Sequence, residues 1–380
     1  MTETTDTLVF LLVVLTRLLV PLLIPRFPLP AILAALVIDA IDQTIFQTFT
    51  HLNLDGYQGY DKALDIYYLT IAYIATLRNW TNLIAFKVSR FLWYYRLVGV
   101  ALFETTYEPP GPRWLLLIFP NTFEYFFIFY EIVRLRWDPV RLTRRATILW
   151  AAAIWIFIKI PQEMWIHILQ LDMTDFIKEN IFGVPADTPP AEILANNIWV
   201  IPALIIAAVL IVVLVWWLLK KLPPKDWDLS FDANSHQDEK TGYVETGTIK
   251  GASDRFFNSV LTEKVILVSL VSIIFAQILP GVEAGILQIA LGVAFVIILN
   301  TVISHWLARR GTEWSHALTQ FIVMGVINTG LVWLYSFLLP SRGGSLNLGN
   351  TLFFALLLTL IVTLFDRYYP IYLARFTEST

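Results

Sequence analysis

The chain has 380 residues, of which 57% are apolar and 15% are charged, and its formal net charge is −3. Soluble domains carry about one quarter charged residues, so this composition, with a mean hydropathy of +0.64, excludes an ordinary soluble protein. The chain contains no cysteine, which excludes disulfides, thiolate metal sites and cysteine nucleophiles. It also has no long basic cluster, and we therefore expect no nucleic-acid partner.

Apolar runs close to the length of a bilayer-spanning helix recur along the chain, and they predict an all-α integral membrane protein. We predict a polytopic helical bundle of about eleven transmembrane helices, within a range of about nine to eleven. The expected spans are 8–24, 29–49, 64–78, 82–103, 114–133, 146–168, 197–219, 264–279, 283–304, 317–339 and 351–367. The runs 64–78 and 264–279 are short for a complete crossing.

Basic residues concentrate on alternate connections between these spans, whereas the other connections are acidic or nearly neutral. The basic connections carry Arg26, Arg78, Arg134, Arg141, Lys220, Lys221, Arg309 and Arg375. Because cytoplasmic loops are enriched in lysine and arginine, we predict that the N-terminus lies outside and the C-terminus in the cytoplasm. The expected location is the plasma membrane of a bacterium, with the lipid bilayer as the immediate partner.

The charge distribution also predicts how the chain is organised. Residues 1–170 form a charged membrane module of six spans, 171–196 an extracytoplasmic loop, 197–221 a peripheral span, 222–258 a polar cytoplasmic linker, and 259–380 an apolar membrane module. The linker opens with Pro223-Pro224 and carries charges of both signs, so it is too hydrophilic to pack in lipid. We expect it to be a mobile loop that could bind a protein partner.

Charged side chains lie deep within the first six predicted spans. Each costs at least ~2.5–3.5 kcal/mol at the bilayer centre, so such groups normally face the bundle interior and pair. The cations are Arg17, Arg96 and Lys159, and the acids are Asp39, Asp42, Glu124 and Glu163. Arg17 could pair with Asp39. Lys159 could pair with Glu163, which lies four residues further on and therefore on the same helix face.

The predicted orientation places these charges between the midplane and the outer surface. Asp39, Gln43 and Gln47 continue as a polar stripe on one face of their helix. Pro120-Asn121 and Pro161 can break helical hydrogen bonding beside the charged residues, and non-helical backbone at this depth is tolerated where it lines a cavity. We therefore expect a polar cavity in the first six spans that opens to the outside.

A carboxylate-lined cavity in a membrane protein favours transport of a small ion or polar solute. In this interpretation Asp39, Asp42, Glu124 and Glu163 bind the ion or relay protons. Arg17, Arg96 and Lys159 then act as counter-charges, and no cofactor is expected.

Two alternatives belong to other classes of protein. The first is a membrane enzyme acting on a lipid head group or lipid-linked substrate at the outer face, in which Mg²⁺ is held by Asp55, Asp61 and Asp65. The chain lacks the motifs of zinc peptidases, P-loop enzymes and serine hydrolases. The second alternative is a structural or assembly protein whose intramembrane charges only lock helices together.

Overall fold

The computed structural model describes residues 3–51, 57–106, 111–171, 173–186, 188–221, 223–236, 259–278, 286–309, 321–330 and 348–377. Within these residues all regular structure is helical. The helices of the first half are α1 (Glu3–Leu19), α2 (Pro28–Phe49), α3 (Tyr57–Asn79), α4 (Leu83–Thr105), α5 (Trp114–Ile118), α6 (Thr122–Arg134), α7 (Arg144–Ala153) and α8 (Ile160–Glu163). Those of the second half are α9 (Met173–Ile177), α10 (Pro190–Asn196), α11 (Val200–Leu219), α12 (Ser259–Ile278), α13 (Ile286–Arg309) and α15 (Leu348–Thr377).

Six helical segments in the described part of the chain are long and apolar enough to cross a membrane. They are Thr4–Leu23, Pro28–Phe49, Trp114–Arg134, Val200–Trp217, Val260–Gln277 and Ala355–Phe376. These segments support the predicted helical integral membrane protein. A count of about eleven spans and the orientation of the termini stay predictions.

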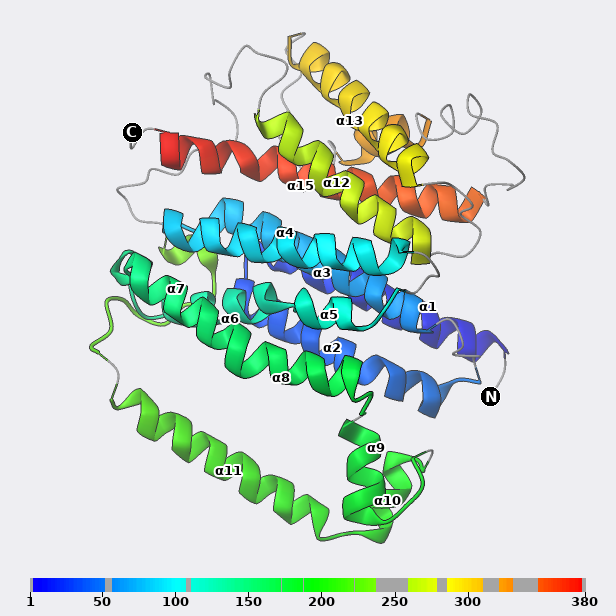
Figure 1. Cartoon of the computed structure of the whole chain (residues 1–380), viewed down its shortest axis with the longest axis vertical. Helices are drawn as coiled ribbons and strands as arrows, with labels where there is room; N and C mark the ends of the chain where they lie inside the picture. The colour runs from blue at the N-terminus through cyan, green and yellow to red at the C-terminus, as the bar shows by residue number, and fades with distance from the viewer. Residues whose placement is uncertain are drawn as a thin grey trace.

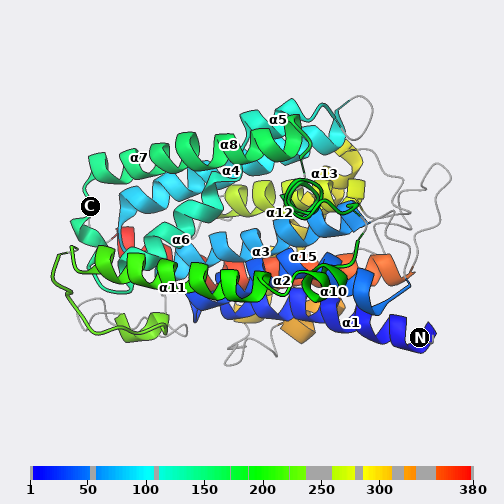
Figure 2. The same ribbon diagram turned by 90° about the horizontal axis from the view of Figure 1, so that it is seen from below.

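The long helices run in a common direction, with α3 and α4 at the centre of the bundle (Figures 1 and 2). Helices α1 and α2 pack beside α3, α6 packs on α4, and both α12 and α15 pack against the central pair. One continuous apolar core therefore includes residues from both halves of the chain. Helix α1 begins and α15 ends at opposite ends of the bundle (Figure 1).

Aromatic packing holds the centre of the bundle together. Trp80 is fully buried and stacks on Tyr130 with the ring centroids 3.8 Å apart. Lipid tails are as apolar as these side chains, so close packing rather than exclusion from water drives such contacts in a membrane. Gly99 permits the closest approach, because a Cβ atom added there would lie 2.1 Å from the Cβ atom of Phe119.

The helix break expected at Pro120 is confirmed, whereas the chain stays helical through Pro161. Helix α5 ends at Ile118 and α6 begins at Thr122, so the predicted span 114–133 is two helices separated at Pro120. Around Pro161 the helix is continuous but irregular, because the short α8 is flanked by wider π-helical turns at Ile154–Lys159 and Met164–Ile168. Both irregularities lie next to the charged residues of α6 and α8, as the sequence suggested.

The first part of the linker is docked on the end of the bundle, so the expected mobile loop is wrong for residues 223–236. Asp226 donates its backbone N–H to the carbonyl of Arg136 at 2.8 Å, and its side chain accepts from the N–H of Asp138 at 2.9 Å and pairs with Arg141. Trp227 donates its indole N–H to the carbonyl of Arg134 at 3.0 Å. The polar groups of this segment thus bind arginine side chains and backbone groups at the helix ends. The polarity of the linker alone does not predict these contacts. Residues 237–258 lie outside the described residues.

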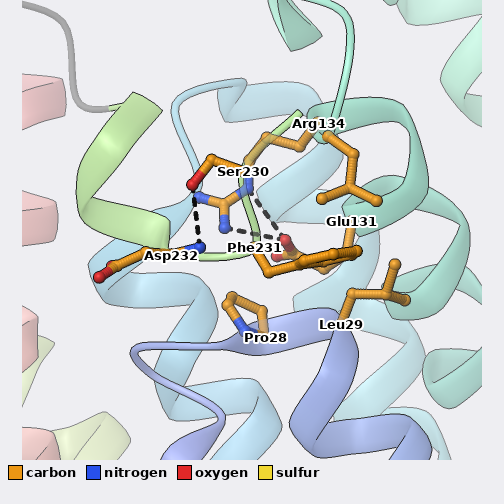
Figure 3. A pocket seen from close by; sticks show the side chains of 8 residues that line it. Pro28, Leu29, Glu131, Arg134, Ser230, Phe231 and Asp232 are labelled. Atoms are coloured by element: carbon orange, nitrogen blue, oxygen red, sulfur yellow. Dashed lines mark hydrogen bonds and ion pairs between the residues drawn. The ribbon is translucent and has the colours of Figure 1, made fainter. Parts of the chain in front are cut away.

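Phe231 extends this docked segment into the bundle end. Figure 3 shows its ring between Pro28 and Leu29 of α2 and Glu131 and Arg134 of α6. The small cavity at this point measures about 10 Å³, close to the smallest space that holds one water molecule. The linker therefore closes the end of the bundle between α2 and α6.

Replacing Asp226 by alanine should release residues 223–236 from the bundle. Hydrogen bonds to a charged group contribute about 1.5–3 kcal/mol, so backbone amides of this segment should exchange with solvent about tenfold faster or more. Hydrogen–deuterium exchange with mass spectrometry measures this effect. Asp228→Ala is the matched control, because Asp228 is exposed and its ion pair in the described part of the chain is with Lys225 of the same segment. Equal exchange in the two variants would contradict docking through Asp226.

Helix α11 lies apart from the packed helices (Figure 1), and the membrane-length segment Val200–Trp217 has no buried residue. Such an apolar helix can face only lipid or another protein. Helix α9 and the turn after it end at Gly183, whose φ of +65° lies in the left-handed region that favours glycine.

The second half of the membrane region contains buried charge that the sequence interpretation missed. Glu263 and Lys264 are both buried near the start of α12, where Glu263 pairs with Arg90 at 2.8 Å and Lys264 pairs with Asp366. The predicted span 264–279 starts too late, since α12 begins at Ser259. Partners on α4 and α15 neutralise Glu263 and Lys264, so both charges can lie inside the helix bundle. Asn300 donates to the Asn328 side chain at 2.8 Å, as expected for polar contacts between membrane helices.

Candidate functional site

Three neighbouring helices bring one arginine and four aspartates together. Arg17 lies in the last turn of α1, Asp39 and Asp42 lie on α2, and Asp61 and Asp65 lie one turn apart on α3. We call these five residues the Arg17 cluster. Helix α3 begins at Tyr57, so Asp61, which precedes the expected span 64–78, is also part of a helix.

Both terminal nitrogens of the Arg17 guanidinium are shared between carboxylates. Nη1 donates to Asp42 at 2.5 Å and to Asp61 at 2.8 Å. Nη2 donates to Asp39 and, at 3.1 Å, to Asp65. The planar, permanently charged guanidinium suits this role, because it presents its hydrogen-bond donors in several directions at once.

The four carboxylates differ in their access to the outside of the protein. Asp42 is completely buried, whereas the side chains of Asp39, Asp61 and Asp65 are 25%, 31% and 36% exposed. Arg17 itself is buried. The cluster therefore has a closed side formed by Asp42 and an open side formed by the other three acids, which we call the aspartate triad.

The members of the aspartate triad lie close together. One oxygen atom from each of them lies within 4.8 Å of the others. With all four acids ionised, the cluster would carry a formal charge of −3. This arrangement can therefore bind protons or a metal cation.

A second group of polar residues surrounds the break between α5 and α6. Glu124, in the first turn of α6, accepts hydrogen bonds from the Tyr68 hydroxyl at 2.5 Å and from the Asn121 side chain at 2.9 Å. The Lys159 ammonium lies 3.8 Å from Glu124 and 4.1 Å from the centre of the Tyr125 ring. Glu124 is therefore held by partners from three elements of the fold.

Glu163 and Arg96 satisfy the backbone groups that this helix break releases. Glu163 accepts from the backbone N–H of Asn121 at 3.0 Å, and Arg96 donates to the carbonyl of Phe119 at 2.9 Å. On its other oxygen, Glu163 lies 3.0 Å from Nε2 of His167. Non-helical backbone thus occurs at this depth because side chains from α4 and α8 supply its hydrogen bonds.

Tyr68 connects the two groups. It lies on α3, three residues and so about one helical turn beyond Asp65, and its hydroxyl bonds Glu124 on α6. Polar side chains therefore follow one another from the aspartate triad through Tyr68 to Glu124, Lys159, Glu163 and His167. A tyrosine in an aromatic-rich span carried no signal of this role, because its spacing is also that of core packing.

The predicted site residues thus form two groups rather than one. Arg17 pairs with Asp39 as suggested. The suggested ion pair of Lys159 with Glu163 differs from the structure, in which Lys159 faces Glu124 and Glu163 faces His167. Arg96 contacts a backbone carbonyl. Helix α3 supplies Asp61, Asp65 and Tyr68 to the interior, whereas the sequence interpretation gave the two aspartates a role only in the enzyme alternative. Asp55 lies outside the described residues.

Comparison with protein-family models, with curated proteins and with solved structures gives no match for this chain. The function of the site is therefore inferred from its own chemistry.

Proposed function

We propose that this protein transports a small cation across the membrane and binds it at the aspartate triad. One observation carries the proposal: a single buried guanidinium serves four carboxylates, three of which are partly exposed. Ionisable groups at this depth are costly, and in transporters they mark ion pathways and proton relays. The excess of negative charge around Arg17 gives an entering cation a favourable place to bind.

Competition between the cation and Arg17 would couple binding to movement. A cation bound by Asp39, Asp61 and Asp65 weakens the hold of these acids on the guanidinium, which Asp42 retains from the closed side. A ligand shifts a conformational equilibrium only through contacts that differ between the two states, and this exchange of partners supplies such a difference. The break beside Pro120 resembles the discontinuous helices near transporter sites.

The second polar group would carry the ion or its proton further into the protein. Tyr68 and Glu124 are hydrogen-bonded, and Lys159, Glu163 and His167 continue from them. Carboxylate and histidine side chains in such a series are the usual groups of membrane proton relays. In this role Lys159 is the counter-charge of Glu124, in place of the suggested partner Glu163.

Asp39→Asn should abolish charge movement by the reconstituted protein. The full chain, in proteoliposomes on a solid-supported membrane, is exposed to concentration jumps of H⁺, Na⁺, K⁺, Mg²⁺ and Ca²⁺, and the transient current is recorded. We expect a current with at least one of these ions in the wild type and its loss, by more than about tenfold, in Asp39→Asn. Asp228→Asn, which removes an exposed acid of the linker, should keep the wild-type current. A current that survives in Asp39→Asn and in Asp61→Asn would contradict the proposal.

A second function is favoured by the geometry of the triad. Three carboxylate oxygens within 4.8 Å of one another suit a divalent cation, which in an enzyme would hold the phosphate groups of a lipid-linked substrate. Titration of the purified protein with Mn²⁺, followed by electron paramagnetic resonance, tests this alternative. Mn²⁺ binding that needs Asp61 and Asp65, together with no current for any ion, would favour the enzyme over the transporter.

A further inference from the structure

An open groove follows one face of α4. It has a volume of about 490 Å³, within the usual size of ligand sites. Its α4 residues recur at helical spacing and therefore share one side of the helix. They are Lys87, Arg90, Phe91, Tyr94, Tyr95 and Val98, and Phe119 completes the lining.

The two ends of the groove differ in chemistry. Lys87 and Arg90 lie toward the start of α4, at the end that carries the predicted cytoplasmic connections, whereas the rest of the lining is aromatic or aliphatic. Arg90 is held by the buried Glu263 at 2.8 Å. Lys87 is exposed and has no hydrogen-bond or ion-pair partner among the described residues. The positive charge left for a ligand at this end is therefore that of Lys87.

The length of the groove matches one leaflet of a bilayer. Lys87 and Val98 are separated by eleven residues, which corresponds to about 16 Å along a helix. Half of a ~30 Å hydrocarbon core is about 15 Å. An acyl chain lying against Tyr94 and Val98 would thus end near the bilayer midplane while its head group remains at Lys87.

Local packing keeps the far end of the groove in shape. Phe119 lies against Gly99, where no other residue type fits without displacing the ring. The Tyr95 hydroxyl donates to the carbonyl of Ile118 at 3.0 Å, and the Tyr95 and Phe119 rings lie 4.5 Å apart. The groove wall is therefore built by the same helix break that positions Glu124.

We propose that this groove is a binding site for an anionic phospholipid, with the head group at Lys87 and Arg90 and one acyl chain along α4. Basic pockets on membrane helices at the cytoplasmic side bind acidic head groups. The apolar lining suits the acyl chain of the lipid, and Lys87 supplies the positive charge that its anionic head group needs. The inference is independent of the ion-binding role proposed for the Arg17 cluster.

Native mass spectrometry of the full chain tests the site, using dioleoyl phosphatidylglycerol and dioleoyl phosphatidylcholine as probes. Wild-type protein should retain the anionic lipid several-fold better. Lys87→Gln should lower affinity for phosphatidylglycerol about fivefold, the effect of one lysine near an anionic surface, and leave phosphatidylcholine unchanged. Val98→Trp, which narrows the groove, should lower retention of phosphatidylglycerol at least as much.

Lys221→Gln is the matched control, because Lys221 is also an exposed lysine at the predicted cytoplasmic end of an apolar helix but lies outside the groove. Equal retention of the two lipids by the wild type would overturn the proposal, and so would equal losses in Lys87→Gln and Lys221→Gln. A dimer whose formation is disrupted by Val98→Trp and which carries no lipid would assign the groove to a second copy of the chain instead.

Discussion

Replacing Arg17 by leucine is expected to destabilise the folded protein by about 3–5 kcal/mol, the usual cost of leaving a buried charge without its partner. The four aspartates would lose their shared cation, and Asp42 is completely buried. The other three are partly exposed, so most of the cost falls on Asp42. Unfolding of the purified protein by sodium dodecyl sulfate in mixed micelles, followed by tryptophan fluorescence, measures the change.

Three further variants separate this effect from a general loss of charge. Arg26→Leu is the matched control, because Arg26 is exposed and pairs with Asp232 at 3.3 Å, so its loss should cost at most about 1 kcal/mol. Arg17→Leu combined with Asp42→Leu should recover part of the stability, since the buried anion is removed as well. The stability of Arg17→Lys should lie between those of the wild type and Arg17→Leu. Lysine keeps the positive charge, but an ammonium cannot reproduce the guanidinium geometry. Equal destabilisation by Arg17→Leu and Arg26→Leu would refute this view of the cluster.

Replacing Glu131 by alanine should cost a similar amount, about 3–5 kcal/mol. Glu131 is buried on α6, accepts the indole N–H of Trp80 at 2.8 Å and binds the Arg134 guanidinium at 2.9 Å. Its loss leaves a buried cation and a buried indole donor unsatisfied. Trp80 follows the last residue of α3, and Arg134 donates to the carbonyl of that residue, Asn79, at 3.2 Å, so the connection between α3 and α6 should loosen.

The same detergent titration measures this second effect, with Glu131→Gln as the conservative comparison. Glutamine keeps an oxygen that can accept from Trp80 but loses the charge opposite Arg134, so an intermediate cost is expected. Glu192→Ala, which removes an exposed acid of α10, should change stability within about 0.5 kcal/mol. A Glu131→Ala protein as stable as Glu192→Ala would show that Glu131 is not a structural link.

The sequence predicted much of the local structure because its signals are local. Apolar runs indicated membrane helices, and Pro120 and Pro161 marked the places where regular hydrogen bonding ends. The expected helix ends differ more from the observed ones where a charged turn lies next to an apolar run. Asp61 and Glu263 lie outside the expected spans 64–78 and 264–279 because hydropathy registers the charge of a residue but not its partner in the fold.

The Arg17 cluster illustrates the same limit at the level of the site. The depth of Arg17, Asp39 and Asp42 along their helices is a property of spacing, so their presence in the interior could be predicted. Their neighbours on α3 could not, because which helices are adjacent depends on packing between distant segments. Tyr68 is the clearest case, since it lies one turn beyond Asp65 on α3 and its hydroxyl bonds Glu124 on α6, a contact that spacing alone cannot predict.

Composition and hydropathy by themselves determined that this is a helical membrane protein with charges in its interior, because insertion into lipid depends on each segment separately. Only the tertiary structure decided which charges meet. Pairing in a membrane depends on which helix faces lie together. That geometry places four carboxylates around Arg17, of which one is buried and three are partly exposed. It also pairs Lys159 with Glu124 rather than with Glu163 on its own helix.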